Sequence, residues 1–214
     1  MSGTLIVGGG PVATKLLRSE LESAPELVIA VDYGGFYLHE LGVIPHILMG
    51  DLDSLSGLVV DKLTGAGVRV IRYSPQKDET DMELALDFAI AGGAKRINIL
   101  GGLGRRLDHS LANIGLLFEA AARNVEVHLL DESHDLTAVR RRIVLERRKG
   151  WAVSLIPLTV KVSGVTTSGL LYPLDNADLF IEKSRGIHNE FCTDTAVIEL
   201  AEGLLLVILF KEEQ

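Results

Sequence analysis

The sequence predicts an α/β protein: an N-terminal domain built on a doubly wound, mostly parallel sheet, followed by a smaller all-β domain, an antiparallel sandwich. Two observations predict this fold class. Up to Leu130, unbroken apolar runs alternate with helical segments, the pattern of parallel strands covered on both faces. From Asp131 the helical periodicity stops, and short β-rich runs alternate with turn residues. We therefore place the two domains at residues 1–131 and 132–214.

In the first domain, each predicted strand is an apolar run that stops at a glycine or a polar residue. The predicted strands are Leu5–Val7, Leu27–Val31, Ile44–Met49, Val68–Ile71, Ile97–Leu100 and Val125–Leu130. The predicted helices are Thr14–Leu21, Phe36–Leu41, Leu58–Thr64, Asp81–Ile90 and Ser110–Arg123. In the second domain the predicted strands are Ile143–Leu145, Ala152–Ile156, Val160–Val162, Gly169–Tyr172, Leu179–Ile181, Ala196–Leu200 and Leu204–Phe210.

The composition excludes several classes of protein. Of 214 residues 47% are hydrophobic, enough for a full core. Lys and Arg number 21 against 29 Asp and Glu, and a net charge of −8 argues against sequence-independent nucleic-acid binding. The longest apolar run, Leu204–Phe210, is too short to span a bilayer. Because Cys192 is the only cysteine and the first residues lack a secretory signal, we expect a cytoplasmic protein.

Two carboxylates follow the third predicted strand, in the segment Gly50-Asp51-Leu52-Asp53-Ser54. If this segment is extended, Asp51 and Asp53 point to the same side, and their repulsion is relieved by a cation. Carboxylate oxygens suit Mg²⁺. The alternative is a loop in which Asp and Ser side chains bond their own backbone. Taken alone, this segment favours the loop over a metal site. The acids elsewhere in the chain make a metal site more favourable.

Further acids also follow predicted strands, whose carboxyl ends meet at one edge of a parallel sheet. Asp32, Asp81 and Asp108 are placed there, together with the cations Lys77 and Arg106. Such a set suits Mg²⁺-nucleotide chemistry, in which positioning and charge neutralisation supply most of the catalysis. Glycines after two of the strands, Gly8–Gly10 and Gly101–Gly104, allow phosphate to approach the backbone, although simple tight turns explain them equally well.

Local structural roles remain open for some of these residues. Thr80 and Glu83 have the spacing of a capping box, and acids in the first helical turn complement the helix dipole without any ligand. In the same way, Asp108 or Ser110 can cap the last helix of the first domain.

Five motifs resemble, in order and spacing, those of the thiamine pyrophosphokinases. They are Asp32-Tyr33-Gly34-Gly35, Gly50-Asp51-Leu52-Asp53-Ser54, Lys77-Asp78-Glu79-Thr80-Asp81, Gly104-Arg105-Arg106-Leu107-Asp108-His109 and Gly186-Ile187-His188-Asn189-Glu190-Phe191. The resemblance covers nearly the whole chain. It implies transfer of the pyrophosphoryl group of ATP to the hydroxyl of thiamine, giving thiamine diphosphate and AMP. It also implies a homodimer whose active site lies between the α/β domain of one subunit and the sandwich of the other.

The resemblance assigns roles to residues through these motifs. It implies that Asp51, Asp53 and Asp81 are Mg²⁺ ligands, and that Arg106 and Asp108 complete the catalytic set. It implies nucleotide contacts for Asp32, Gly34, Lys77, Asp78, Arg106 and His109. It implies thiamine contacts for His188, Asn189 and Asp78.

The chain departs from the family pattern at four positions near these motifs. Tyr33 stands where the family has glycine, Phe36 where it has a polar residue, Arg105 where it has a second glycine and His188 where serine is usual. Two alternatives therefore remain: a pyrophosphokinase for another hydroxymethyl heterocycle such as a pterin, or a catalytically silent homologue that binds a nucleotide or a thiamine compound. The many acids argue against the silent binder, because a binder has no need of them.

Overall fold

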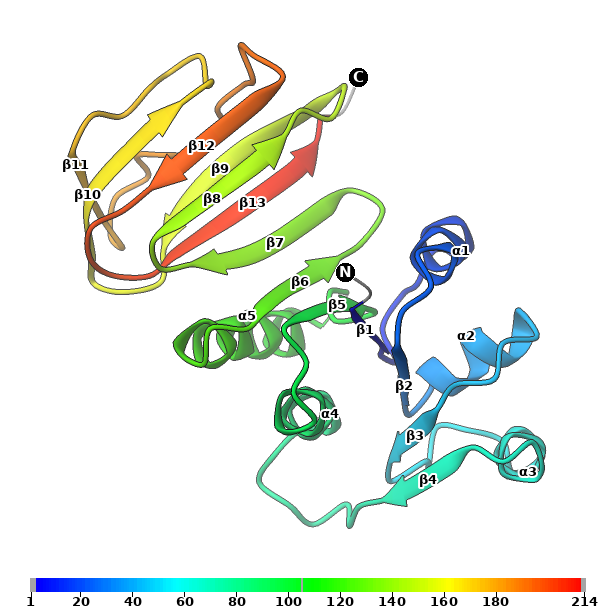
Figure 1. The fold of residues 1–214 in the computed structure, drawn as a ribbon. Helices are drawn as coiled ribbons and strands as arrows, with labels where there is room; N and C mark the ends of the chain where they lie inside the picture. The colour runs from blue at the N-terminus through cyan, green and yellow to red at the C-terminus, as the bar shows by residue number, and fades with distance from the viewer. Residues whose placement is uncertain (1–2, 105, 213–214) are drawn as a thin grey trace. The chain divides into compact units, whose positions relative to one another are not determined.

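The computed structural model describes residues 3–104 and 106–212 (Figure 1). These residues form two compact units, the first ending at Glu132 and the second beginning at Ser133. Unit 1 combines helices with parallel strands, and unit 2 is built from antiparallel strands. The predicted fold class is thus confirmed. Within the described ranges, no helix is both long and apolar enough to cross a membrane.

Unit 1 is organised around parallel strands hydrogen-bonded in the order β4-β3-β2-β1-β5-β6. Their bounds are β1 Thr4–Val7, β2 Leu27–Val31, β3 Ile47–Gly50, β4 Arg69–Arg72, β5 Arg96–Leu100 and β6 Glu126–Leu130. The inner strands are almost entirely buried, as unbroken apolar runs require.

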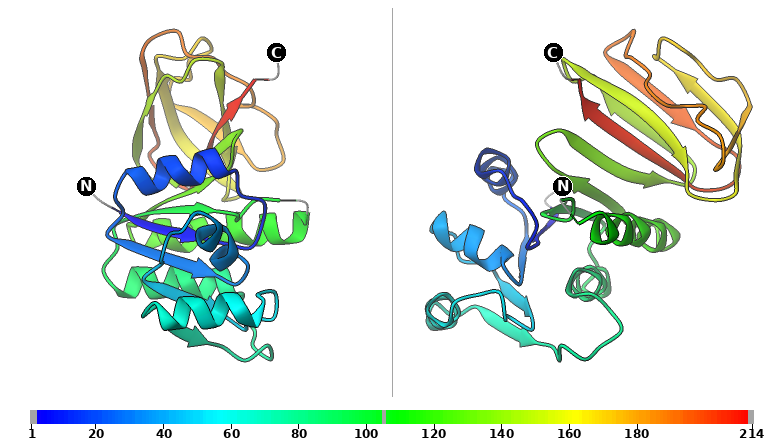
Figure 2. Two further views of the ribbon diagram at one scale, coloured as in Figure 1. Left: turned by 90° about the vertical axis from the view of Figure 1, so that its right-hand side faces the viewer. Right: turned by 180° about the vertical axis from the view of Figure 1, so that it is seen from behind.

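Helices cover both faces of this sheet (Figures 1 and 2). On one face lie α1 (Thr14–Glu22), α2 (Gly34–Glu40) and α3 (Gly57–Gly65), and on the other lie α4 (Asp81–Ala91) and α5 (Leu107–Ala122). Leu17, Leu38 and Leu63 from the first three helices pack with alternate strand residues such as Leu5 and Leu48 in one apolar cluster. The core therefore holds the strand ends in fixed positions, and the loops that follow them carry the polar residues.

The strand order reverses between β1 and β5. From β1 the chain runs outward through β2, β3 and β4, and it then returns to add β5 and β6 on the other side of β1. Neighbouring loops after β1 and β5 therefore diverge in opposite directions. In open α/β sheets such a switch point leaves a crevice outside the carboxyl ends of the strands, where ligands bind.

Helix α5 differs from its prediction in two respects. It begins at Leu107 rather than Ser110, and neither Asp108 nor Ser110 is its N-cap, a position taken by Arg106. Helical spacing also predicts an apolar side formed by Leu111, Leu117, Phe118 and Ala121, but only Leu117 and Ala121 are buried, whereas Leu111 and Phe118 are exposed. The buried side instead includes a polar residue, Asn113.

Unit 2 contains two antiparallel sheets, ordered β7-β13-β9 and β11-β10-β12-β8. Their bounds are β7 His134–Val139, β8 Arg142–Glu146, β9 Trp151–Pro157, β10 Lys161–Ser168, β11 Ala177–Phe180, β12 Thr195–Glu199 and β13 Leu205–Lys211. The sheets lie face to face in Figure 1, and Val153, Val207 and Ile198 are among the buried residues of their shared core. This is the predicted sandwich.

Two strand predictions in unit 2 were wrong. Strand β7 was missed, and the segment 169–172 is not a strand. Gly169 has a φ of +77° and Leu170 makes only an isolated bridge, to Phe191, so the segment forms a turn rather than a ladder.

Candidate active site

A cleft of about 660 Å³ opens at the switch point of unit 1. The backbone turns after β1 and β5 form two of its walls, with Gly10 N donating to Gly101 O at 3.1 Å. Side chains from the loop after β2, the loop after β3 and the starts of α4 and α5 complete the lining. Its size lies within the range of about 300–1,000 Å³ that is usual for small-molecule sites.

The cleft brings together five of the residues that the sequence placed in the site. They are Asp32, Asp53, Asp81, Arg106 and His109. Asp51, Gly34, Lys77, Asp78 and Asp108 belong to the same loops or helix starts but do not line the cleft itself.

Asp32 directly follows β2 and adopts a left-handed conformation with a φ of +46°. Its Oδ1 accepts a hydrogen bond from Leu52 N at 3.3 Å, which ties the loop after β2 to the loop after β3. Gly50 leaves the necessary room: its φ is +136°, and a Cβ there would lie 1.7 Å from Asp32 Oδ1. A glycine is therefore required at the end of β3 by the position of this carboxylate.

The pKa of Asp32 is raised from 3.8 to about 7. Burial is the largest cause, and repulsion from the Asp81 carboxylate is the next. Asp51 raises the pKa further, while the Leu52 hydrogen bond and the Lys77 ammonium lower it. The contributions of Asp81 and Asp51 show that the neighbouring carboxylates repel Asp32, and a cation in the cleft would relieve this repulsion.

The Asp51–Asp53 segment is not extended, so the condition under which both carboxylates would point to the same side is not met. Leu52 has a φ of +63°, and Asp53 N donates to Asp51 Oδ1 at 3.1 Å. The Asp51 side chain therefore bonds its own backbone, which was the alternative interpretation of this segment. The Leu52 side chain is buried in the core, so it anchors the loop while Asp53 stays exposed at the cleft.

At the start of α4, Thr80 Oγ1 accepts a hydrogen bond from Glu83 N at 3.1 Å, which is the predicted cap. Asp81 lies in the first turn and forms a largely buried ion pair with Lys77, 2.6 Å between Oδ1 and Nζ. The Lys77 ammonium also lies 5.5 Å from the centre of the Tyr73 ring. Asp78 is exposed in the preceding loop.

At the start of α5, Arg106 and Asp108 form an exposed ion pair, 2.6 Å between Nη2 and Oδ2. The hydrogen bond from the guanidinium holds the pKa of Asp108 at about 2. Ser110 Oγ accepts from Gly104 N at 3.1 Å and donates to Arg106 O at 3.1 Å, and so shapes the glycine turn. Because both side chains of this ion pair are exposed, a bound anion can replace Asp108 as the partner of Arg106.

The donor set fits a hard cation, although it does not form a complete cage. Among residues 3–104 and 106–212, no three His, Cys, Asp or Glu side chains are grouped closely enough to hold a metal ion. Magnesium, however, usually takes only one or two carboxylates and completes its shell with water and substrate phosphates. Asp53 and Asp81 in the cleft, with Asp51 beside it, can supply such carboxylates.

The two expected substrate residues of unit 2 have different surroundings. Asn189 is buried, and its amide is bonded to the backbone on both sides: Oδ1 accepts from Tyr172 N at 3.0 Å and Nδ2 donates to Tyr172 O at 2.8 Å. His188 is exposed with a φ of +56°, and its Nε2 lies 3.3 Å from Glu212 Oε1. Asn189 therefore orders the loop that presents His188.

Of the residues that depart from the family pattern, Tyr33 and Phe36 lie beside each other in the structure. The Tyr33 ring stacks on Phe36 with centroids 4.9 Å apart, and it meets Tyr37 edge-on at 5.3 Å. Tyr33 lines the cleft, so the replacement of a glycine adds an aromatic wall there. Arg105 lies outside the described residues.

Sequence reasoning missed one buried polar residue of the cleft, Asn113, and assigned Ser110 only a possible capping role. Asn113 Nδ2 donates to Gly102 O at 2.7 Å and so holds the turn after β5. Helical spacing could have indicated the burial of Asn113, because it lies four residues before the buried Leu117, on the side of α5 that packs inward.

Both units match models of one family. Residues 18–129 match the thiamin pyrophosphokinase catalytic domain, and residues 140–205 match the thiamin pyrophosphokinase vitamin B1 binding domain. The chain is 31% identical to thiamine pyrophosphokinase from Bacillus subtilis over 95% of its own length and 96% of the relative's.

Two solved structures align with this chain over almost its full length. The crystal structure of the Bacillus subtilis thiamine pyrophosphokinase aligns with a TM-score of 0.88 at 28% identity, covering 98% of this chain and 99% of that one. The thiamin pyrophosphokinase from Geobacillus thermodenitrificans aligns with a TM-score of 0.82 at 32% identity, covering 99% and 98%. The chain therefore belongs to the thiamine pyrophosphokinase family.

Proposed function

We propose that this protein is a cytoplasmic thiamine diphosphokinase, which transfers the pyrophosphoryl group of ATP to the hydroxyl of thiamine and releases AMP. One structural observation carries the proposal within the family: an acidic cleft walled by glycine turns at the switch point of the sheet. The thiamine hydroxyl attacks the β-phosphorus and loses its proton to an aspartate of the cleft, and the bridging oxygen between the α- and β-phosphates leaves with AMP.

The nucleotide phosphates would lie against the turns after β1 and β5, because backbone there can be approached closely and N–H groups can donate to phosphate oxygens. Arg106 and His109 at the start of α5 line the same cleft. Arg106 has a fork of donors that suits phosphate, and its exposed pair with Asp108 can be exchanged for one. Lys77, Asp78, Asp32 and Gly34 complete the proposed nucleotide set.

We propose Asp51, Asp53 and Asp81 as the carboxylates that hold Mg²⁺. A bound Mg²⁺ supplies charge neutralisation at the phosphate oxygens. The pKa of Asp32, raised mainly by burial and secondly by the Asp81 carboxylate, is consistent with this assignment, because a cation in the cleft would offset the repulsion between the two carboxylates. The Lys77 ammonium, which pairs with Asp81, would be free to move to phosphate once the carboxylate is otherwise neutralised.

We propose that the thiamine site uses His188 and the loop ordered by Asn189, and that the active protein is a homodimer. In this arrangement unit 1 of one subunit would work with unit 2 of the other. The exposure of His188 supports direct contact with thiamine, while the hydrogen bonds of Asn189 to the backbone support a role in holding the loop.

The test is AMP formation from ATP and Mg²⁺ with thiamine, with a hydroxymethylpterin, and with neither. Thiamine-dependent AMP with thiamine diphosphate as co-product is the expected result. AMP only with the pterin would show that the alcohol pocket has changed, and no AMP from folded, ATP-binding protein would show a silent binder. The family matches do not favour either alternative.

A further inference from the structure

Two side chains of α5 hold the turn that follows β5, at residues 101–104. Asn113 Nδ2 donates to Gly102 O at 2.7 Å, and Ser110 Oγ accepts from Gly104 N at 3.1 Å. Asn113 follows Ser110 by three positions, so both side chains leave the helix on the same side. Helix α5 thus fixes the shape of a turn that lines the proposed catalytic cleft.

Asn113 determines the direction of one N–H group in this turn. Gly102 O and Leu103 N belong to one trans peptide, in which the C=O and the N–H point in opposite directions. Because Gly102 O faces the Asn113 amide, the Leu103 N–H is directed away from Asn113. The flipped amide would place two oxygens against each other, so the nitrogen of Asn113 must face Gly102 O.

The turn keeps two successive N–H groups for a ligand. Gly101 O accepts from Gly10 N at 3.1 Å, so the Gly102 N–H of the same peptide is directed away from Gly10. Neither Gly102 N nor Leu103 N donates to an acceptor among residues 3–104 and 106–212, and both residues line the cleft. Gly101 is left-handed, with a φ of +69°. Successive N–H groups beside a left-handed residue form concave sites that bind anions.

The Asn113 hydrogen bond is difficult to replace. Asn113 is only 8% exposed and Gly102 is also buried, so water has little access to the Gly102 carbonyl. Without its donor this oxygen would be left buried and unsatisfied, which is costly. Glycine has several backbone conformations within reach, so the peptide can rotate to satisfy the oxygen elsewhere. Such a rotation would turn the Leu103 N–H away from its present direction.

We propose that Asn113 is a positioning residue for the phosphates of the nucleotide. By holding Gly102 O, it keeps the N–H groups of Gly102 and Leu103 available to a phosphate oxygen in the cleft. This role rests on the proposed function, which places the triphosphate against the turn. Asn113 acts through the backbone of the turn and does not itself bind the phosphate.

The test is an NMR titration of the ¹⁵N-labelled full chain with inorganic tripolyphosphate, in the presence of Mg²⁺ and without thiamine. In the parent protein the Gly102 and Leu103 backbone amides should show saturable shifts, because their N–H groups gain an acceptor. Asn113→Leu, which keeps the approximate size of the side chain but removes the donor, should weaken tripolyphosphate at least about tenfold. Since thiamine is absent, a failure of transfer to thiamine would leave these results unchanged.

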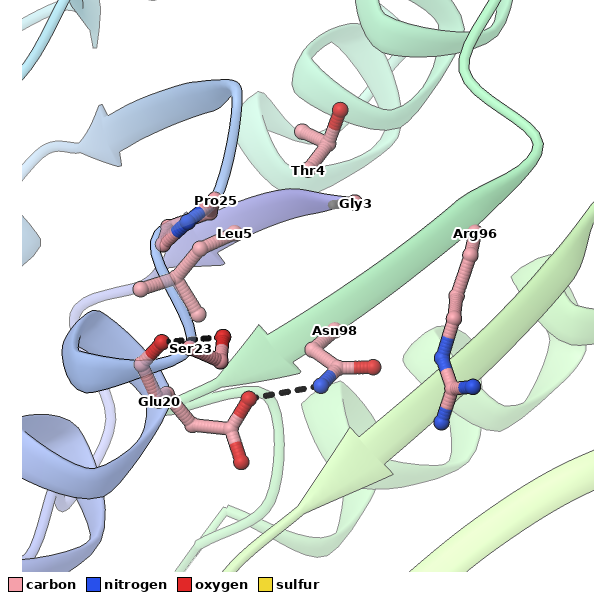
Figure 3. Close-up of a pocket in the computed structure, with 8 residues that line it drawn as sticks. All are labelled: Gly3, Thr4, Leu5, Glu20, Ser23, Pro25, Arg96 and Asn98. Carbon is pink, nitrogen blue, oxygen red and sulfur yellow. Dashed lines mark hydrogen bonds between the residues drawn. The ribbon is translucent and has the colours of Figure 1, made fainter. Parts of the chain in front are cut away.

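Asn98→Leu is the matched control. It is the same substitution on β5, where Asn98 Nδ2 donates to Glu20 Oε2 at 2.6 Å in a pocket beside the amino ends of the strands, away from the cleft (Figure 3). This control should lower the melting temperature and leave the affinity for tripolyphosphate unchanged. In steady-state kinetics Asn113→Leu should raise KM for ATP and leave KM for thiamine unchanged, a split that a general loss of stability does not produce.

Three results would overturn the proposal. One is a folded Asn113→Leu variant that binds tripolyphosphate as tightly as the parent. Another is the absence of saturable shifts at the Gly102 and Leu103 amides of the parent, a measurement that holds even if Asn113→Leu does not fold. The third is an equal loss of affinity in Asn98→Leu, which would show that both substitutions act through stability alone.

Discussion

At Asp32, burial and the neighbouring Asp81 carboxylate have an effect that can be measured through the pH dependence of stability. The pKa of Asp32 is about 7 in the folded protein and 3.8 in the unfolded chain, so the folded state holds its proton more tightly. The free energy of unfolding therefore falls as pH rises between about 4 and about 7. In metal-free buffer, Asp32→Asn should remove this fall while keeping an acceptor oxygen for Leu52 N.

Urea denaturation across that pH range measures the effect. The variant should be more stable than the parent protein above pH 7 and no more stable below pH 4, and the parent should regain stability on addition of Mg²⁺. Asp61→Asn, which removes an exposed carboxyl on α3, is the matched control. A constant difference between Asp32→Asn and the parent at every pH would contradict the raised pKa of Asp32.

Asp53 tests the catalytic assignment without disturbing the fold. Its side chain is exposed at the cleft, and the hydrogen bond that shapes its loop uses its backbone N–H rather than its carboxylate. Asp53→Ala should lower turnover at least about a hundredfold, with an unchanged circular dichroism spectrum and melting temperature. Full activity in this variant would remove Asp53 from the proposed metal ligands.

At the scale of single elements, the cap of α4 positions Asp81. Thr80→Ala removes the hydrogen bond to Glu83 N and should lower the free energy of unfolding by about 1 kcal/mol. Thr14→Ala, at the exposed start of α1 where no side-chain cap exists, should change it little. Equal losses in chemical denaturation would show that the Thr80 hydroxyl does not stabilise the helix.

The strand-end loops show where sequence reasoning succeeds and where it stops. Unbroken apolar runs predicted the parallel strands, and the residues that stop them were therefore assigned to the functional edge. The conformation of the Asp51–Asp53 loop could not be predicted, because it depends on where the buried Leu52 side chain finds room. The early start of α5 depends on the geometry of the preceding glycine turn, in which Gly104 N donates to Ser110 Oγ.

Unit 2 illustrates the same limit for strands. Strand β7 carries Asp135 and Thr137 at buried positions, so it lacks an apolar alternation. Asp135 is compensated by Arg148, 2.6 Å between Oδ2 and Nη2, a partner that lies 13 residues away and was not visible in a local pattern. The hydrophobic pattern does not predict this strand, because one of its buried positions holds a carboxylate whose partner is a half-exposed arginine.

At the scale of the whole molecule, the proposed homodimer predicts shared active sites. Light scattering should give twice the chain mass of 23.1 kDa. Asp53→Ala in unit 1 and His188→Glu in unit 2 should each be inactive alone. After mixing and subunit exchange, activity should recover to about a quarter of the parent value, because half of the molecules become heterodimers with one intact site.

Each other outcome of the mixing experiment is informative. A monomer, or no recovery from two dimeric and folded variants, would contradict a site shared between subunits. Activity in His188→Glu by itself would remove His188 from the proposed thiamine site.

The most direct test of the central claim follows the phosphates of ATP. With ATP labelled at the α-phosphate, the label should appear in AMP, and with ATP labelled at the β-phosphate it should appear in thiamine diphosphate. Both transfers should require thiamine and Mg²⁺. Thiamine monophosphate formed together with α-labelled ADP, or label release that is independent of thiamine, would contradict pyrophosphoryl transfer by this protein.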